Sequence, residues 1–195
     1  MEQETLYTSS KWDILKALEL GSKSPIDLAK DANTSLANVS QQLRLLELAG
    51  IVKSERIPNR DKGQPRILYS LSGNNSYLLI TSPNFVDKRS ILLQQHQVEL
   101  MKIWFCDDTS LHYYMEKFYW ANEEKISGLK LLAFDYNDSQ NIKVLVNEDF
   151  AEKKSQKEMK IAGPQGEKKF STIVVKSLAN IKEGKYTILR DIAEV

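Results

Sequence analysis

The chain of 195 residues contains one cysteine, Cys106, and only two histidines. A lone cysteine cannot close a disulfide within the chain, and such sparing use of cysteine is typical of a reducing compartment. Zinc sites and most nucleophilic active sites need several Cys or His side chains, and the glycine motifs that cradle phosphates are absent from the sequence. We therefore expect no metal, no cofactor and no enzymatic activity, with Cys106 acting as a small buried hydrophobic residue.

Long apolar runs are also missing from the sequence. No segment approaches the roughly 18 uninterrupted apolar residues of a membrane helix. The segment Met1–Lys11 lacks the basic region followed by an apolar one that marks a secretory signal. We therefore expect a cytoplasmic protein with no membrane partner.

The net charge is only +1, which excludes a protein that coats DNA through its overall charge. Positive charge is nevertheless concentrated between Ser35 and Ser70, as in the footprint of a nucleic-acid-binding segment. The cations there are Arg44, Lys53, Arg56, Arg60, Lys62 and Arg66, and the carboxylates are Glu47, Glu55 and Asp61. The alternative is a local fluctuation of surface charge.

The segment Leu36–Ile51 shows the clearest pattern of the chain. Leu36, Val39, Leu43 and Leu46 recur at spacings of three and four, which predicts a helix with one buried stripe. The opposite face holds short amides, hydroxyls and one cation: Ser35, Asn38, Ser40, Gln41, Gln42 and Arg44. Asn and Gln can form paired hydrogen bonds with adenine, and Arg can do so with guanine. This face therefore predicts DNA contact, and the alternative is a polar surface without a partner.

The segments on either side predict a helix-turn-helix followed by a hairpin. Ser24–Asp31 is expected to be a short helix with Ser24 as its N-cap and Pro25 at its first position. The polar turn at 33–35 would join it to the next helix. Downstream, two strands are predicted to enclose a basic turn. The strands are Ile51–Ile57 and Arg66–Leu71, and the turn is Pro58–Pro65.

Residues from about Lys11 to Ser72 resemble the winged helix-turn-helix domain of ArsR-like prokaryotic transcription regulators. The resemblance is carried by NVSQQLRLLELAGIV, by KSERI, by a Gly-Gln-Pro-Arg wing and by ILYSLS. It implies that the helix at 35–49 enters the major groove and that the wing at 58–65 contacts the flanking backbone or minor groove. The DNA-facing residues so implied are Asn38, Gln41, Gln42 and Arg44 in the helix and Arg60, Lys62 and Arg66 in the wing, with Ser35 and Ser40 beside them. Metal-sensing members carry Cys-x-Cys on this helix, which here contains no cysteine.

The middle of the chain predicts helices. From Phe85 to about Phe105 the apolar spacing predicts one long helix. In regulators of this class such a helix commonly forms the dimer interface, so the resemblance implies a homodimer, which suits a palindromic operator. The alternative is a helix packed only within its own chain. Between Leu111 and Tyr119 an aromatic stripe predicts a packed core more readily than the lining of a small-molecule pocket.

Beyond Ile126 the pattern changes to strands with one charged helix. Strands are predicted at Leu129–Tyr136, Ile142–Val146 and Phe170–Val175, a helix at Asp149–Lys160, and a strand or helix at Tyr186–Ala193. The opening of this segment faintly resembles a minimal nucleotidyltransferase domain. Lys143 stands where that family needs metal-binding carboxylates, so the resemblance implies a module without catalysis.

The sequence thus predicts an α+β protein with long linking helices between two domains. A winged helix-turn-helix DNA-binding domain is expected at 1–82, a helical linker and dimerisation region at 83–126, and a small α/β domain at 127–195. The predicted function is sequence-specific regulation of transcription by a homodimer on double-stranded DNA, with room for a small-molecule or protein effector at the C-terminal domain. The alternative is a winged-helix protein-interaction module that carries a non-catalytic nucleotidyltransferase-like domain.

Overall fold

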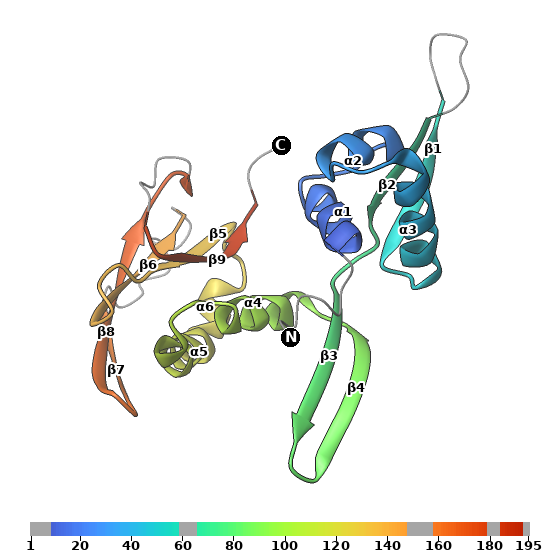
Figure 1. The fold of residues 1–195 in the computed structure, drawn as a ribbon. Coiled ribbons are helices and arrows are strands. Elements are labelled where there is room, and N and C mark those ends of the chain that lie inside the picture. The colour runs from blue at the N-terminus through green and yellow to red at the C-terminus, as the bar shows by residue number, and fades with distance from the viewer. Residues whose placement is uncertain (1–8, 59–65, 148–157, 179–183, 193–195) are drawn as a thin grey trace. The chain divides into compact units, whose positions relative to one another are not determined.

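The computed structural model describes residues 9–58, 66–147, 158–178 and 184–192. The chain divides into two compact units, Met1–Leu92 and Leu93–Val195. Both units combine helices with strands (Figure 1), which confirms the predicted α+β class. Among the described helices, none has the length and apolar character needed to span a membrane.

The first unit consists of three helices, a two-stranded wing and a second hairpin. Its elements are α1 (Ser9–Glu19), α2 (Pro25–Asp31), α3 (Leu36–Leu48), β1 (Val52–Ile57), β2 (Arg66–Leu71), β3 (Asn75–Ser82) and β4 (Phe85–Leu92). The predicted helix-turn-helix and the two wing strands are confirmed. The core is small and entirely aliphatic, and it consists of Ile14, Leu18, Leu28, Val39, Leu43, Leu46 and Val52.

The second hairpin corrects the expectation of one long helix at 85–105. β4 pairs antiparallel with β3, and Ser82 lies opposite Phe85, so Pro83 and Asn84 form a two-residue loop. Asn84 has a left-handed φ of 68°, and a proline followed by such a residue is the chemistry of a type II turn. The prediction was wrong because it used only the apolar spacing of this segment. The turn at Pro83 and Asn84 instead folds residues 85–92 back onto β3 as a strand.

The second unit packs helices on a five-stranded sheet with the order β7-β8-β6-β5-β9. Its helices are α4 (Gln95–Trp104), α5 (His112–Ala121) and α6 (Glu123–Ile126), with a short 3-10 turn at Thr109–Leu111. Its strands are β5 (Leu131–Asp135), β6 (Asn141–Val146), β7 (Glu158–Gly163), β8 (Gly166–Val174) and β9 (Tyr186–Asp191). β6 and β8 run parallel, and the other neighbouring strands run antiparallel.

The strand predictions for this unit are confirmed, and the segment at Tyr186 is a strand rather than a helix. The predicted helix Asp149–Lys160 is wrong at its end, because Glu158–Gly163 forms β7 and pairs with β8 across a tight turn. The turn places Gly163 opposite Gly166, and the alternating pattern of β7 fits this pairing. Residues 149–157 of the predicted helix lie outside the described residues.

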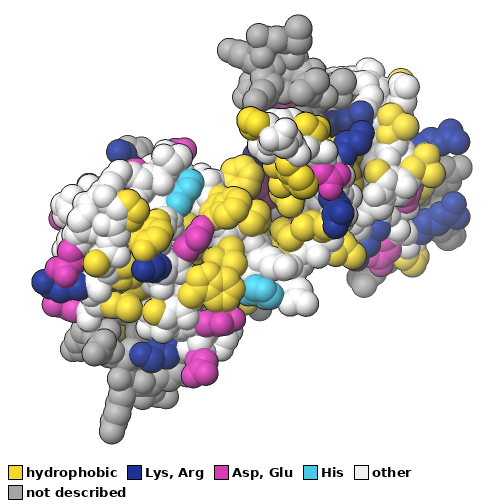
Figure 2. All heavy atoms as spheres, turned by 90° about the horizontal axis from the view of Figure 1, so that it is seen from below, with side chains coloured by type: hydrophobic (Ala, Val, Ile, Leu, Met, Phe, Trp, Pro, Cys, Tyr) yellow, Lys and Arg dark blue, Asp and Glu magenta, His cyan; other side chains and the backbone are white. Residues whose placement is uncertain are grey.

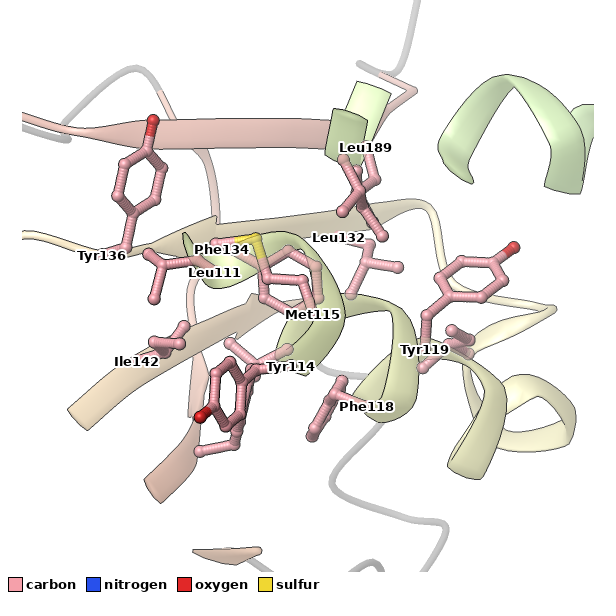
Figure 3. Packing of buried hydrophobic residues seen from close by; sticks show 14 of the residues in the cluster. Leu111, Tyr114, Met115, Phe118, Tyr119, Leu132, Phe134, Tyr136, Ile142 and Leu189 are labelled. Atoms are coloured by element: carbon pink, nitrogen blue, oxygen red, sulfur yellow. The ribbon is translucent and has the colours of Figure 1, made fainter. Parts of the chain in front are cut away.

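The aromatic residues of α5 pack in the hydrophobic core. The sequence favours this role over the lining of a small-molecule pocket. Figure 3 shows its side chains directed at the sheet, where Phe118 stacks on Phe170 with ring centroids 4.9 Å apart. The Tyr114 hydroxyl donates to the carbonyl oxygen of Gly166 at 3.0 Å and accepts from the amide of Gln165 at 2.8 Å. Cys106 is buried in the same cluster, as predicted.

Candidate nucleic-acid interface

Two serine caps fix the helix-turn-helix. Ser24 precedes α2 and accepts a hydrogen bond from the Asp27 amide at 3.3 Å, and Ser35 precedes α3 and accepts from the Asn38 amide at 3.2 Å. Each cap satisfies an amide that has no partner within its helix. Between the helices Asn33 adopts a left-handed φ of 44°. The turn is therefore short and locally determined, as the sequence predicts.

The outward face of α3 carries two long side chains with base-reading chemistry. Val39, Leu43 and Leu46 are buried and define the inward face. Gln41 and Arg44 are three residues apart and therefore lie on the same side of the helix. Both are exposed, on the side opposite to the buried residues. Ser40 is exposed beside them, and its hydroxyl donates to the Leu36 carbonyl at 2.8 Å.

Two of the predicted contact residues are engaged inside the domain instead. The Asn38 amide nitrogen donates to the hydroxyls of Ser10, at 3.1 Å, and Thr34, at 3.0 Å, and the Asn38 amide oxygen accepts from Gln42 at 3.2 Å. Both side chains are half-buried, and the oxygen of the Gln42 amide is buried with no partner among the described residues. This Asn38–Gln42 network connects α3 to α1, so it sets the position of α3.

The wing continues the same surface. β1 and β2 pair antiparallel from Val52 opposite Leu71 to Ile57 opposite Arg66, and Arg66 is exposed. A backbone bridge between Lys23 and Tyr69 ties β2 to the segment before α2, and burial raises the pKa of the Tyr69 hydroxyl. Predicted wing residues Arg60 and Lys62 lie outside the described residues.

The structure adds Arg56 to the candidate residues. The Ser54 hydroxyl donates to the Glu47 carboxylate at 2.6 Å, so this face of β1 is turned toward α3. Side chains two apart on a strand share a face, and exposed Arg56 therefore lies on the same face as Ser54, opposite Ile67. The period-two alternation of the strand could have identified Arg56 from the sequence.

A groove of about 610 Å³ lies between α2, α3 and β2. Its lining is mixed and consists of Ser24, Pro25, Ile26, Asp27, Leu36, Ser40, Arg66, Ile67 and Leu68. Leu36 was predicted to be in the buried stripe but is 47% exposed and lines this groove, because it stands at the first turn of α3, beyond the reach of the core.

Charge divides the groove into two sides. On the α2 side, the Ser24 hydroxyl donates to the Asp27 carboxylate at 2.6 Å, and this hydrogen bond lowers the pKa of Asp27. Asp27 is therefore ionised at neutral pH and repels phosphate there. On the β2 side, Arg66 supplies a permanent cation. An approaching phosphate backbone is accordingly favoured next to the wing and disfavoured next to α2.

Comparisons with known proteins identify the helix-turn-helix. Residues 8–54 match the family model described as "Bacterial regulatory protein, arsR family". A solved structure of the ferric uptake regulator from Francisella tularensis with iron is 19% identical, and the match covers 56% of this chain and 84% of that chain with a TM-score of 0.29. No curated protein sequence matches the chain. The faint nucleotidyltransferase resemblance of the C-terminal part has no support from these comparisons.

Proposed function

Since residues 8–54 form a helix-turn-helix domain of the arsR family, which indicates a DNA-binding transcriptional regulator, we propose that this chain reads a specific double-stranded DNA sequence. α3 enters the major groove, and the wing lies on the flanking backbone or minor groove. The observation that carries the proposal is the outward face of α3, where Gln41 and Arg44 are exposed side by side. Their side chains can pair with adenine and guanine edges.

The proposed roles separate base contact from positioning. Gln41 and Arg44 are free to reach bases, whereas Asn38 and Gln42 are held in hydrogen bonds to each other and to α1 and the turn. Arg56, Arg66 and the wing cations Arg60 and Lys62 would contact phosphates, which supply most of the affinity but no sequence information. Relative to the expectation from sequence, the base-reading set is thus reduced to two residues.

The proposed regulator acts as a homodimer. Two-fold symmetric proteins bind two half-sites about one helical turn apart, so each copy would place its α3 in one major groove. An operator for this protein would accordingly be an inverted repeat. A monomer with a single α3 would read too few base pairs to distinguish its operator from the rest of a genome.

A DNA titration tests the proposal. Fluorescence anisotropy would be measured with DNA from the region upstream of the coding sequence and with a scrambled duplex, each at two salt concentrations. Preference for the native duplex and a steep loss of affinity with salt are expected, because phosphate contacts release counterions. Absence of binding to both duplexes would instead favour a protein-interaction module, whose apolar contacts depend little on salt.

Substitutions on α3 sharpen the titration. Arg44→Ala is expected to cost roughly 1–3 kcal/mol on the preferred duplex and much less on the scrambled one. Arg89→Ala is the matched control, because Arg89 is an exposed arginine of β4, outside the proposed interface. Equal losses on the two duplexes would contradict base reading by Arg44, and a loss with Arg89→Ala would contradict the placement of the interface.

A further inference from the structure

The β3–β4 hairpin projects from the helices of the first unit as an isolated pair of strands (Figure 1). Among the described residues, β3 is paired only with β4. Large apolar side chains are nevertheless exposed on both strands, with Tyr77 at 52%, Leu79 at 57% and Val86 at 74%. An isolated two-stranded hairpin is only marginally stable in water. Exposed large apolar side chains on both of its strands therefore indicate a partner. Figure 2 shows that hydrophobic side chains lie at the surface of the protein among charged ones.

The two edges of this hairpin differ in chemistry. The middle of β4 is charged, with Asp87, Lys88 and Arg89 in succession. β3 contains no charged residue and no proline between Asn75 and Ser82. Charges on an edge strand prevent pairing with another chain, and an uncharged apolar edge invites it. The open backbone groups of β3 are therefore the available pairing site of the hairpin.

The sequence of β3 is symmetric in polarity. Polar residues at both ends, Asn75-Ser76 and Thr81-Ser82, enclose four apolar residues, Tyr77–Ile80. In an antiparallel pair of such strands, Leu78, Leu79 and Ile80 can each lie opposite an apolar residue of the other copy. Self-complementarity of this kind is what a two-fold interface requires, because the same patch must serve on both sides.

We propose that β3 is the interface with a second copy of this chain, and that two hairpins join through β3 into one antiparallel sheet of four strands. A two-fold axis normal to the sheet keeps each face on its own side, so opposed residues are both odd-numbered or both even-numbered. An axis at Leu79 places Leu79 opposite itself, Leu78 opposite Ile80, and Ser76 opposite Ser82. It also places Tyr77 opposite Thr81, an aromatic residue opposite a β-branched one, which is a favourable cross-strand pair. An axis at Leu78 would oppose Tyr77 to Leu79 but also Ser76 to Ile80, a small polar residue to a large apolar one, so we place the axis at Leu79.

The charges of β4 explain why this assembly stops at two copies. In the joined sheet both outer edges are β4, so Asp87, Lys88 and Arg89 face any further chain. These charged edges block further addition, and the association closes as a dimer instead of continuing as a fibre. This inference rests on the homodimer of the proposed function and locates its interface away from the DNA-binding face.

Sedimentation velocity without DNA tests the interface independently of DNA binding. The unmodified chain is expected to be a dimer, and Leu79→Lys is expected to weaken dimerisation by about tenfold or more, because it opposes two like charges at the axis. Val86→Lys is the matched control, since Val86 is also an exposed apolar residue of the same hairpin but lies on β4. It should leave the dimer intact.

Mixing two variants tests the register itself. Leu79→Lys and Leu79→Glu should each be monomeric alone and should form a mixed dimer when combined, because an axis at position 79 sets the two opposite charges directly across from each other. Circular dichroism of each variant checks that the fold is kept. A monomeric unmodified chain, or a dimer that survives Leu79→Lys, would overturn the proposal. A monomer that still binds its operator would overturn this interface and the proposed homodimer, and would leave DNA binding through α3 standing.

Discussion

In both units a polar network fixes a helix in position, but the two networks are built from different chemistry. α4 of the second unit is held by a charged pair, Glu99 and Arg190, that is almost completely buried. α3 of the first unit is held by neutral amides, Asn38 and Gln42, that are half-buried. The charged network is buried and has a full set of hydrogen-bond partners. The neutral network is smaller and lies beside the solvent-exposed face of α3.

The Glu99–Arg190 pair has a full set of partners. Arg190 donates to both carboxylate oxygens of Glu99, at 2.8 and 2.9 Å, and its third nitrogen donates to the carbonyl oxygens of Ile126, Ser127 and Leu129. The Tyr119 hydroxyl donates to Glu99 at 2.8 Å, and burial together with this hydrogen bond raises the pKa of Tyr119. A buried charge is tolerated only with such complete pairing. The comparison teaches that the second unit uses charge to connect distant segments, while the first unit keeps its charge for the surface.

The largest loss of stability is expected when one member of the charged pair is removed. Arg190→Met leaves the Glu99 carboxylate buried without its cation and is expected to cost about 3–5 kcal/mol in the free energy of unfolding. Denaturant titration of the second unit measures this cost, and Arg89→Met, at an exposed arginine, is the control. Combining Arg190→Met with Glu99→Met should recover much of the loss, because an apolar pair leaves no buried charge. A double variant as unstable as the sum of the two single ones would contradict this account.

Disruption of the neutral network should cost less stability. Asn38→Ala removes the hydrogen bonds to Ser10 and Thr34 and is expected to lower the free energy of unfolding of the first unit by roughly 1–3 kcal/mol. Below its melting temperature this variant should keep the selectivity of DNA binding, whereas Gln41→Ala should reduce selectivity without changing stability. Thermal unfolding and anisotropy on the same samples separate the two effects. A selective loss of operator binding in folded Asn38→Ala would return Asn38 to the base-reading set.

The smallest expected effect concerns the cap of α2. Ser24→Ala removes an N-cap and is expected to cost about 1 kcal/mol. The substitution should also raise the pKa of Asp27 toward its ordinary value, because the hydrogen bond from the Ser24 hydroxyl is the largest cause of its lowering. Asp27 therefore contributes stability above its ordinary pKa and loses it as the pH falls through the lowered value. NMR titration of the Asp27 carboxyl should show the shift, and an unchanged pKa in the variant would exclude Ser24 as its cause.

The first unit was largely predictable because its signals are local. The spacing of Val39, Leu43 and Leu46 determines which side of α3 is buried, and the serine caps mark where α2 and α3 begin. What the sequence could not supply was the neighbour of each polar residue. Asn38 lies on the polar side of its own helix, yet its partner Ser10 is 28 residues earlier in α1. A pattern confined to one helix does not contain that information.

The second unit shows the same limit over longer distances. Glu99 lies in a segment correctly expected to be helical, where a carboxylate would ordinarily face solvent, but its partner is 91 residues away on β9. The wrong helix at 85–92 has a related cause. β4 pairs with β3 through a two-residue loop at 83–84, where the sequence predicts a domain boundary and not a hairpin. The burial of the aromatic stripe of α5, in contrast, could be predicted from the sequence, because its large apolar residues recur on one side of a single helix. Tyr114, Met115, Phe118 and Tyr119 are all buried.

The burial of Cys106 makes the molecule well suited to labelling at a single site. It is the only cysteine of the chain, and its thiol is enclosed in the core of the second unit. A cysteine introduced at an exposed position, such as Arg44 on α3 or Lys88 on β4, would therefore be the thiol that reacts with a nitroxide or a fluorophore. In the proposed dimer, the distance between two probes at position 44 would give the spacing of the two α3 helices in solution, and the distance between two probes at position 88 would give that of the two hairpins.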